Sequence, residues 1–309
     1  MLFLRLHTKL QLRKMNQCRL CNKQKSLVES HIIPKFIGRW LIKTSATGYL
    51  RDINKPNLRC QDIIKTKLLC KQCEDILSDH ESYFADNIFH PYMNRPSHIY
   101  NLSYTNQLSK FCAGLSWRVL IYLTEINAIH NNSEFENTKE ALRNYILGDS
   151  DNLGQYEQHL IPLEGGAIAD FKLTKSNLNA YITRAIDIDL LTIADEDYLI
   201  YTKLPNFILI SNINYTHINK MRPSRIAIKQ GAMTSKNYLL PPEFFKYLQY
   251  RLNYIHSNFT NKISENQNAK IIDTIKQNPE RLLNSRTLKA VEADLHPNQF
   301  IFRDKGKPF

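Results

Sequence analysis

The stretches Cys18-Arg-Leu-Cys21 and Cys70-Lys-Gln-Cys73 bracket the run Glu29-Ser-His-Ile-Ile-Pro34, and together they decide the fold. Each Cys-x-x-Cys pair can present two thiolates to one metal ion, and four thiolates are a ligand set that tetrahedral Zn²⁺ prefers. A site with four protein ligands is structural, because no position is left for a substrate. We therefore predict a zinc site that leaves His31 free for another task and has the ligands Cys18, Cys21, Cys70 and Cys73.

Composition limits the classes of protein to which this chain can belong. Of the 309 residues, 43% are hydrophobic and 23% are charged, which is typical of a globular fold. Paired cysteines in a chain of this length favour bound metal in a reducing compartment over disulfides, so we expect a cytoplasmic protein. Basic residues interrupt the first 14 positions, and no run approaches the about 18 apolar residues of a membrane span. We expect neither a signal peptide nor contact with a membrane.

An excess of basic residues favours a polyanionic partner. The chain has 41 Lys and Arg against 29 Asp and Glu, a formal net charge of +12. Nucleic acid, in particular double-stranded DNA, fits such a charge. Between the two cysteine pairs, cations are interleaved with Phe36, Trp40 and Tyr49, a mixture that can contact phosphates and press on sugars or bases. The cations that we predict to contact nucleic acid are Lys35, Arg39, Arg51, Arg59 and Lys67.

The pattern of apolar residues predicts an α+β fold in three parts. We expect an N-terminal extension at residues 1–16, a zinc-stabilised domain at 17–95, and a C-terminal part at 96–309. The C-terminal part is expected to be mainly helical with a small mixed or antiparallel sheet. Its spacing predicts helices over 107–130 and 133–147, strands over 180–188, 197–202 and 206–211, and further helices from Pro241 onward.

The first cysteine pair, the run from His31 to Pro34 and the second cysteine pair followed directly by Glu74 resemble the HNH, or ββα-metal, endonucleases with zinc knuckles. The resemblance covers residues 17 to about 90. It implies an N-terminal domain in which a β-hairpin carries a catalytic histidine and the following helix carries a metal ligand. It also implies hydrolysis of DNA phosphodiester bonds, with His31 as the general base and Glu74 as a catalytic metal ligand.

Hydrolysis of this kind requires a base for the attacking water and a hard cation for the charge on the phosphate. A histidine suits the first task, and Mg²⁺ or Mn²⁺ on oxygen ligands suits the second. In a helix that starts near Lys71, Glu74 and Glu81 share one face, so we predict both as ligands of this ion. His80 points away from Glu74, and we expect it at the surface.

Three positions differ from the pattern of the family, and one of them is Glu74, which replaces the final histidine. Ser30 stands directly before His31, where the family often has an acidic residue. The middle asparagine of the family is absent shortly before the second cysteine pair. Asn54 and Asn57, which lie earlier in the chain, are both candidates for its role.

Other classes of function stay open alongside the nuclease. By analogy with the family, the nuclease could be an effector of bacterial defence against phage or plasmids, with the C-terminal part sensing a signal, forming a homo-oligomer or binding a sensor protein. A second class is a zinc-dependent nucleic-acid-binding protein without catalysis. A third is an assembly scaffold that acts through residues 96–309.

Overall fold

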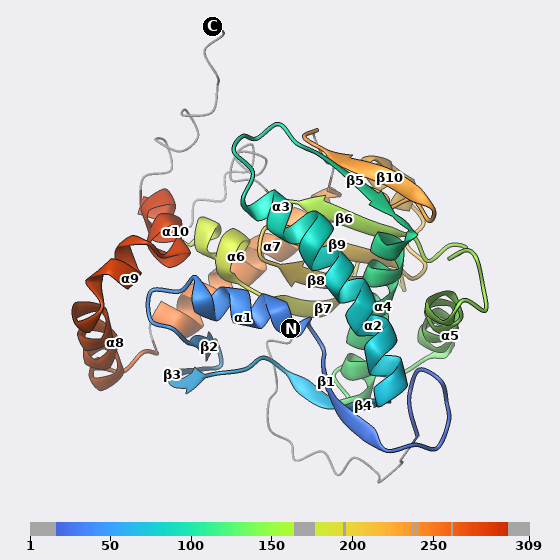
Figure 1. Ribbon diagram of the computed structural model, residues 1–309, viewed down its shortest axis with the longest axis horizontal. Coiled ribbons are helices and arrows are strands. Elements are labelled where there is room, and N and C mark those ends of the chain that lie inside the picture. The colour runs from blue at the N-terminus through green and yellow to red at the C-terminus, as the bar shows by residue number, and fades with distance from the viewer. Residues whose placement is uncertain are drawn as a thin grey trace, which may run out of the picture.

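The computed structural model describes residues 17–163, 177–193, 196–236, 238, 240–260 and 262–295. The predicted extension at 1–16 lies outside the described residues. The fold is α+β, with small antiparallel sheets among helices, as the sequence predicts. In Figure 1 a four-stranded sheet lies in the middle of the molecule, and the N-terminal and C-terminal helices lie around it. Among the described residues no helix is both long and apolar enough to cross a membrane.

Two paired strands that are distant in the sequence, called the β1–β4 hairpin below, and the helix after them carry six of the twelve predicted site residues. β1 (Leu27–His31) pairs antiparallel with β4 (Lys65–Cys70), and α2 (Lys71–Phe84) begins at the next residue. Between the two strands the chain forms α1 (Lys35–Lys43), β2 (Leu50–Asp52) and β3 (Lys55–Cys60). β2 and β3 form a hairpin where the sequence suggests only a polar loop.

A long, buried helix connects this region to the rest of the chain. After α2 the chain continues through the π-helical turn η1 (Ala85–Phe89), α3 (His90–Met93) and β5 (Asn101–Thr105) into α4 (Asn106–Glu125). Nearly every turn of α4 is buried, and its Phe111 ring stacks on Phe84 of α2 at 4.0 Å between centroids. One hydrophobic cluster therefore contains residues from both sides of the predicted boundary at residue 95.

The helix after α4 is placed by local sequence signals. α5 (Ser133–Leu147) has the bounds that the sequence predicts. The Asn132 side chain accepts a hydrogen bond from the Phe135 N–H, which satisfies one of the free donors of the first turn. The helix ends at Gly148, whose φ of 85° is readily available only to glycine.

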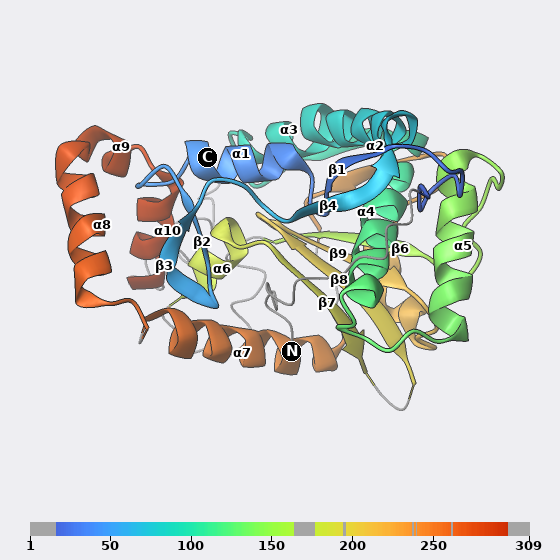
Figure 2. The same cartoon turned by 90° about the horizontal axis from the view of Figure 1, so that it is seen from below.

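The central sheet is antiparallel and has helices on both faces. Its strand order is β6 (Gln158–Pro162), β9 (Phe207–Asn212), β8 (Tyr198–Leu204) and β7 (Asp187–Thr192). Side chains alternate between faces along a strand. Thus Phe207 and Leu209 join the cluster around α4, whereas Ile208 and Ile210 pack with α7 (Pro242–Ile255). Figure 2 shows α7 running along the far side of this sheet from α4.

The predicted strand at 180–188 is wrong over most of its length. The structure forms α6 (Leu178–Arg184) there, and β7 begins only at Asp187. The Asp294 carboxylate accepts hydrogen bonds from the backbone N–H groups of Asn179 and Ala180, at 2.7 and 3.0 Å. Because this acceptor is distant in the sequence, local propensity does not reveal that it stabilises the start of a helix.

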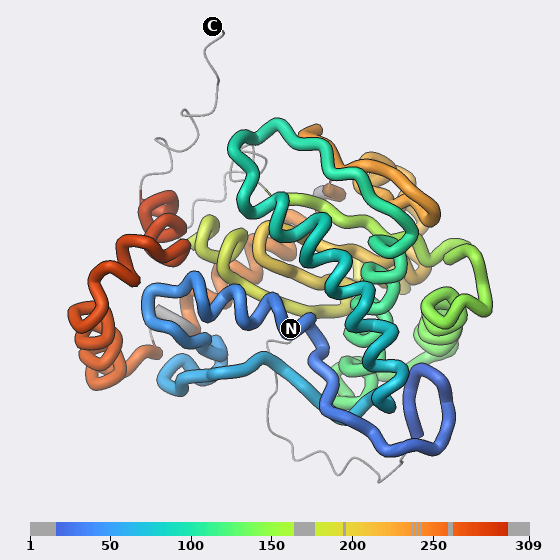
Figure 3. Tube along the Cα trace, in the orientation of Figure 1, coloured from blue at the N-terminus to red at the C-terminus, as the bar shows by residue number. Residues whose placement is uncertain are grey.

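The remaining elements follow β9 in the chain and lie outside the central sheet. η3 (Ile218–Ser224) follows the sheet, and β10 (Gln230–Thr234) pairs with β5. After α7 come the π-helical turn η4 (His256–Thr260), α8 (Glu265–Gln277), α9 (Pro279–Leu283) and α10 (Arg286–Leu295). Figure 3 shows this last segment folding back beside α1 and the β2–β3 hairpin.

Candidate functional site

The four predicted zinc ligands come together although 48 residues separate the two pairs. The Sγ atoms of Cys18, Cys21, Cys70 and Cys73 all lie within 4.8 Å of one another. The Cys21 and Cys70 sulfurs are 4.0 Å apart, twice the length of a disulfide bond, so the thiols are free. Among the described residues this is the only group of three or more Cys, His, Asp or Glu side chains that could hold a metal ion. Four thiolates in this space fit Zn²⁺.

The backbone around the first cysteine pair forms a tight knuckle. The Asn22 N–H donates to the Cys18 carbonyl at 2.9 Å, and Asn22 has a φ of 57°, a left-handed conformation that asparagine tolerates better than most residues. The Arg19 N–H donates to the Leu68 carbonyl of β4 at 3.0 Å. The first knuckle is thus joined to the strand that leads into the second.

His31 lies at the end of β1 and is mostly buried. Its Nε2 atom is 3.0 and 3.1 Å from the two carboxylate oxygens of Asp62. Asp62 also accepts a hydrogen bond from the Ile63 N–H at 2.9 Å. Burial raises the pKa of Asp62, but the hydrogen bonds from His31 and the Ile63 N–H outweigh it, so the net pKa lies below the usual range. No described residue hydrogen-bonds to His31 Nδ1, so this atom keeps its lone pair when Nε2 carries the proton.

Charged side chains continue along the His31 face of the hairpin. Glu29 lies two positions before His31, and residues at this spacing share a face of a strand. Lys65 is the cross-strand neighbour of His31, and its Nζ atom lies 2.8 Å from Glu29 and 3.7 Å from Asp62. His31 is therefore bordered by two carboxylates and one ammonium group, which are partly open to solvent.

The opposite face of β1 points to α2. Ser30 is fully buried, and its hydroxyl donates to the Glu74 carboxylate at 2.6 Å. Glu81 lies roughly two helical turns after Glu74 on α2 and forms an ion pair with Arg118 of α4. The two carboxylates that the sequence suggests as ligands of one ion therefore have different partners. The Glu74 carboxylate and the Ser30 hydroxyl are oxygen groups, the ligand type that Mg²⁺ and Mn²⁺ prefer.

Four of the five cations predicted to contact nucleic acid are exposed, namely Lys35, Arg39, Arg59 and Lys67. Arg51 differs, because its guanidinium donates to the Pro56 carbonyl and, at 3.3 Å, to the Tyr49 hydroxyl. The Arg59 guanidinium lies 4.6 Å from the centroid of the Tyr49 ring. Arg51 thus stabilises the β2–β3 hairpin of its own chain.

Neither candidate for the middle asparagine contacts His31. Asn54 accepts a hydrogen bond from the Tyr254 hydroxyl at 2.7 Å, and Asn57 bonds to the backbone of Lys262 and Ser264 at 2.9 Å. Asn54 therefore holds the β2–β3 hairpin to the last turn of α7, and Asn57 holds it to the segment between η4 and α8.

Two residues near the site differ from expectation. His80 is not at the surface: it is buried and hydrogen-bonds to Gln107 of α4, because α4 covers this side of α2. Asp62 was not among the predicted site residues although it is the hydrogen-bond partner of His31. No pattern in the sequence indicates this contact, because Asp62 reaches His31 only through the pairing of β1 with β4.

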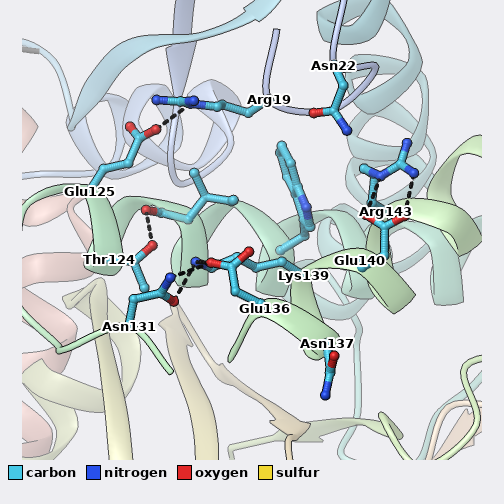
Figure 4. A pocket seen from close by; sticks show the side chains of 12 residues that line it. Arg19, Asn22, Thr124, Glu125, Asn131, Glu136, Asn137, Lys139, Glu140 and Arg143 are labelled. Atoms are coloured by element: carbon cyan, nitrogen blue, oxygen red, sulfur yellow. Dashed lines mark hydrogen bonds and ion pairs between the residues drawn. The ribbon is translucent and has the colours of Figure 1, made fainter. Parts of the chain in front are cut away.

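An open pocket of about 560 Å³ lies between the first knuckle, α4 and α5 (Figure 4). Figure 4 shows its basic side chains turned to carboxylates rather than to the empty space. The positive and negative charges on the wall cancel, so the pocket has no charge with which to select an ion. The ion pairs are Arg19 with Glu125 at 2.5 Å, Lys139 with Glu136 at 2.8 Å and Arg143 with Glu140 at 2.6 Å.

Comparison of the chain with known proteins finds no matching family, curated protein or solved structure. The case for a function therefore depends on the chemistry of the described side chains. That chemistry is concentrated on the two faces of β1, beside the four cysteines.

Proposed function

We propose that this chain is a zinc-stabilised HNH-type endonuclease that hydrolyses DNA phosphodiester bonds with the help of a bound divalent cation. The observation that carries the proposal is the His31–Asp62 pair. An imidazole whose Nε2 is held by an ionised carboxylate, and whose Nδ1 has no hydrogen-bond partner among the described residues, has the arrangement of a general base.

Each residue near His31 has a role in the proposed reaction. Asp62 accepts a hydrogen bond from the Nε2–H group and so fixes the tautomer of His31. Nδ1 is then free to take the proton of the attacking water. Lys65 lies beside Asp62 with its ammonium group partly exposed, where it can contact a phosphate oxygen. Glu74 and Ser30 are the residues that would hold Mg²⁺ or Mn²⁺. A bound divalent cation supplies stabilisation of the negative charge that develops on the phosphate.

Double-stranded DNA is the substrate that the charge of the chain favours. The net charge is +12, and four of the five cations predicted to contact nucleic acid are exposed. Phosphate contacts by Lys and Arg give binding that weakens with salt and does not depend on sequence. A role in defence against phage or plasmids, a cytoplasmic location and assembly with a sensor protein stay predictions from the resemblance.

A second candidate is a zinc-dependent nucleic-acid-binding protein without catalysis. One observation favours it: Ser30 stands where an acidic ligand is expected, and among the described residues no group of three Cys, His, Asp or Glu side chains that could hold a metal ion includes Glu74. In that case His31 and Asp62 would stabilise the end of the hairpin.

Cleavage of supercoiled plasmid with and without Mg²⁺ distinguishes the two candidates. We expect the wild type to nick the plasmid only with the cation, and His31→Ala to reduce the rate by about 10²- to 10⁴-fold. His130→Ala is the matched control, because this histidine is exposed and lies outside the site. Equal nicking by wild type and His31→Ala would remove His31 from the mechanism. Binding that is indifferent to Mg²⁺, without cleavage of DNA or RNA, would select the second candidate.

A further inference from the structure

Arg118 lies on α4, outside the segment that resembles a nuclease, yet it contacts the candidate site directly. Its side chain is fully buried. Nη1 donates to the carbonyl oxygen of His31 at 2.7 Å, and Nη2 forms an ion pair with Glu81 of α2. A buried guanidinium is costly unless it is paired, so these two contacts determine where Arg118 can lie.

The contact with the His31 carbonyl acts on the end of β1. The next N–H along the chain, that of Ile32, donates to the Ile64 carbonyl at 3.0 Å. The peptide group between His31 and Ile32 is therefore held at both ends, by Arg118 on one side and by the Ile64 carbonyl, directly before β4, on the other. The orientation of this peptide group sets the direction in which the imidazole leaves the backbone and thus its reach to Asp62.

Arg118 also connects the two elements that carry the proposed catalytic groups. β1 carries His31, and α2 carries Glu74 together with Glu81, the partner of Arg118. A planar guanidinium can bond to a carbonyl and a carboxylate at the same time in a fixed geometry, whereas an ammonium group has no such fork. An arginine at this position therefore fixes β1 relative to α2 in a way that a lysine does not.

We infer that Arg118 is a positioning residue that holds the His31 imidazole against Asp62. Its meaning for catalysis depends on the proposed nuclease function, but the orientation of His31 can be measured without any activity. The inference makes α4, and with it the C-terminal part of the chain, a component of the site.

Two variants test this role in the full-length, zinc-loaded protein. Arg118→Lys keeps a positive charge opposite Glu81 and loses the fork. The double variant Arg118→Met with Glu81→Gln removes both charges, so that neither is left buried without a partner. Arg184→Lys is the matched control, because Arg184 also donates to a backbone carbonyl, that of Leu41 at 2.7 Å, but lies away from His31.

The first measurement is ¹⁵N NMR of the histidine side chains, with the His31 signals identified by their loss in His31→Gln. For the wild type and Arg184→Lys we expect one protonated and one unprotonated ring nitrogen. For both Arg118 changes we expect His31 signals averaged between tautomers, because the ring is no longer held against Asp62. Wild-type signals of His31 in both Arg118 variants would overturn the inference.

The second measurement is steady-state cleavage of DNA. Misplacing a catalytic group by about 1 Å can cost about 10²-fold, so we expect kcat of Arg118→Lys to fall by about 10²-fold with KM within about twofold. An unchanged kcat in both variants would also contradict the inference. If the wild type does not cleave while the NMR signals change as expected, the nuclease proposal fails and the positioning role of Arg118 stands.

Discussion

An aspartate holds a basic side chain in two regions of the molecule, but solvent reaches only one of these pairs. In the sheet region, formed by β6 to β9 and α7, the Asp187 and Arg251 side chains are 1% and 0% exposed and make two hydrogen bonds of 2.9 and 3.0 Å. In the knuckle region, residues 17–95, the Asp62 and His31 side chains are 41% and 11% exposed. The first pair is surrounded by the chain's own groups, whereas the second is open to solvent.

This difference separates structural polar groups from candidate catalytic ones. The Tyr181 hydroxyl lies 3.2 Å from Asp187 and 2.9 Å from the Tyr201 hydroxyl, so aromatic side chains surround the closed pair. Breaking a buried pair of this kind is destabilising, and a substrate has no access to it. The open pair contributes less to stability because solvent screens it. The predictions below test this contrast, from the largest expected effect to the smallest.

Loss of zinc is expected to have the largest effect, and it should act first on the knuckle region. Structural zinc binding in small domains is coupled to folding and is worth about 10–16 kcal/mol. We expect Cys70→Ser, or a strong chelator, to lower the free energy of unfolding by several kcal/mol and to release zinc, as measured by metal analysis and thermal unfolding. Cys60→Ser is the control, since Cys60 lies outside the cluster. Full stability without bound metal would show that apolar packing alone holds the hairpin to α2.

Breaking the closed pair should affect stability alone. In Arg251→Met the Asp187 carboxylate stays buried without its cation, which typically costs about 3–5 kcal/mol. We expect urea unfolding to show a loss of this size, while the cleavage rate per folded molecule stays at the wild-type value. A selective loss of cleavage in fully folded Arg251→Met would place the chemistry in the sheet region.

The sheet region also contains a fully buried histidine, His159, and its titration should change the free energy of unfolding. His159 is fully buried between Glu157, Ser224 and the Met221 carbonyl, and burial lowers its pKa to about 4 although the Met221 carbonyl favours the charged form. In the unfolded chain His159 takes up a proton as the pH falls below 6.5, whereas in the folded state it does so only near pH 4. The free energy of unfolding should therefore fall by roughly 3 kcal/mol as the pH drops through this range.

Comparison with His159→Gln isolates this contribution. We expect the variant to lose that part of the pH dependence between pH 6.5 and 4 in urea titrations, since glutamine does not titrate. An identical slope in wild type and variant would mean that other groups account for the acid sensitivity.

The open pair should behave in the opposite way to the closed one. Asp62→Asn keeps the size of the side chain but removes the negative charge that fixes the His31 tautomer. We expect kcat to fall by about 10- to 100-fold and the melting temperature to stay near the wild-type value, because Asp62 is partly exposed. Large destabilisation of Asp62→Asn with no specific effect on kcat would assign Asp62 a structural role.

Local sequence signals are sufficient for part of this structure. The Cys-x-x-Cys spacing brings the four sulfurs together, and the cap at Asn132 with Gly148 delimits α5. Nearly continuous runs of apolar and aromatic residues predict β8 and β9, because both faces of these strands are covered. In each case the determining residues lie within the element itself or repeat a short motif.

The remaining features depend on contacts between distant segments. Asp294 accepts hydrogen bonds from the first turn of α6, Arg118 bonds to the end of β1, and Gln107 hydrogen-bonds to the buried His80. Asp62 reaches His31 only because the hairpin brings the start of β4 back to the end of β1. These partners lie between 27 and 115 residues from the groups they contact, so no local pattern contains them.

The most direct test of the nuclease proposal is a crystal structure of zinc-loaded protein with Mn²⁺ and an uncleavable DNA, with anomalous diffraction recorded for both metals. We predict a zinc peak among the four cysteine sulfurs, a Mn²⁺ peak on Glu74, and the scissile phosphate beside the free Nδ1 atom of His31. DNA bound with no Mn²⁺ on Glu74, or with its phosphates out of reach of His31, would contradict the proposal.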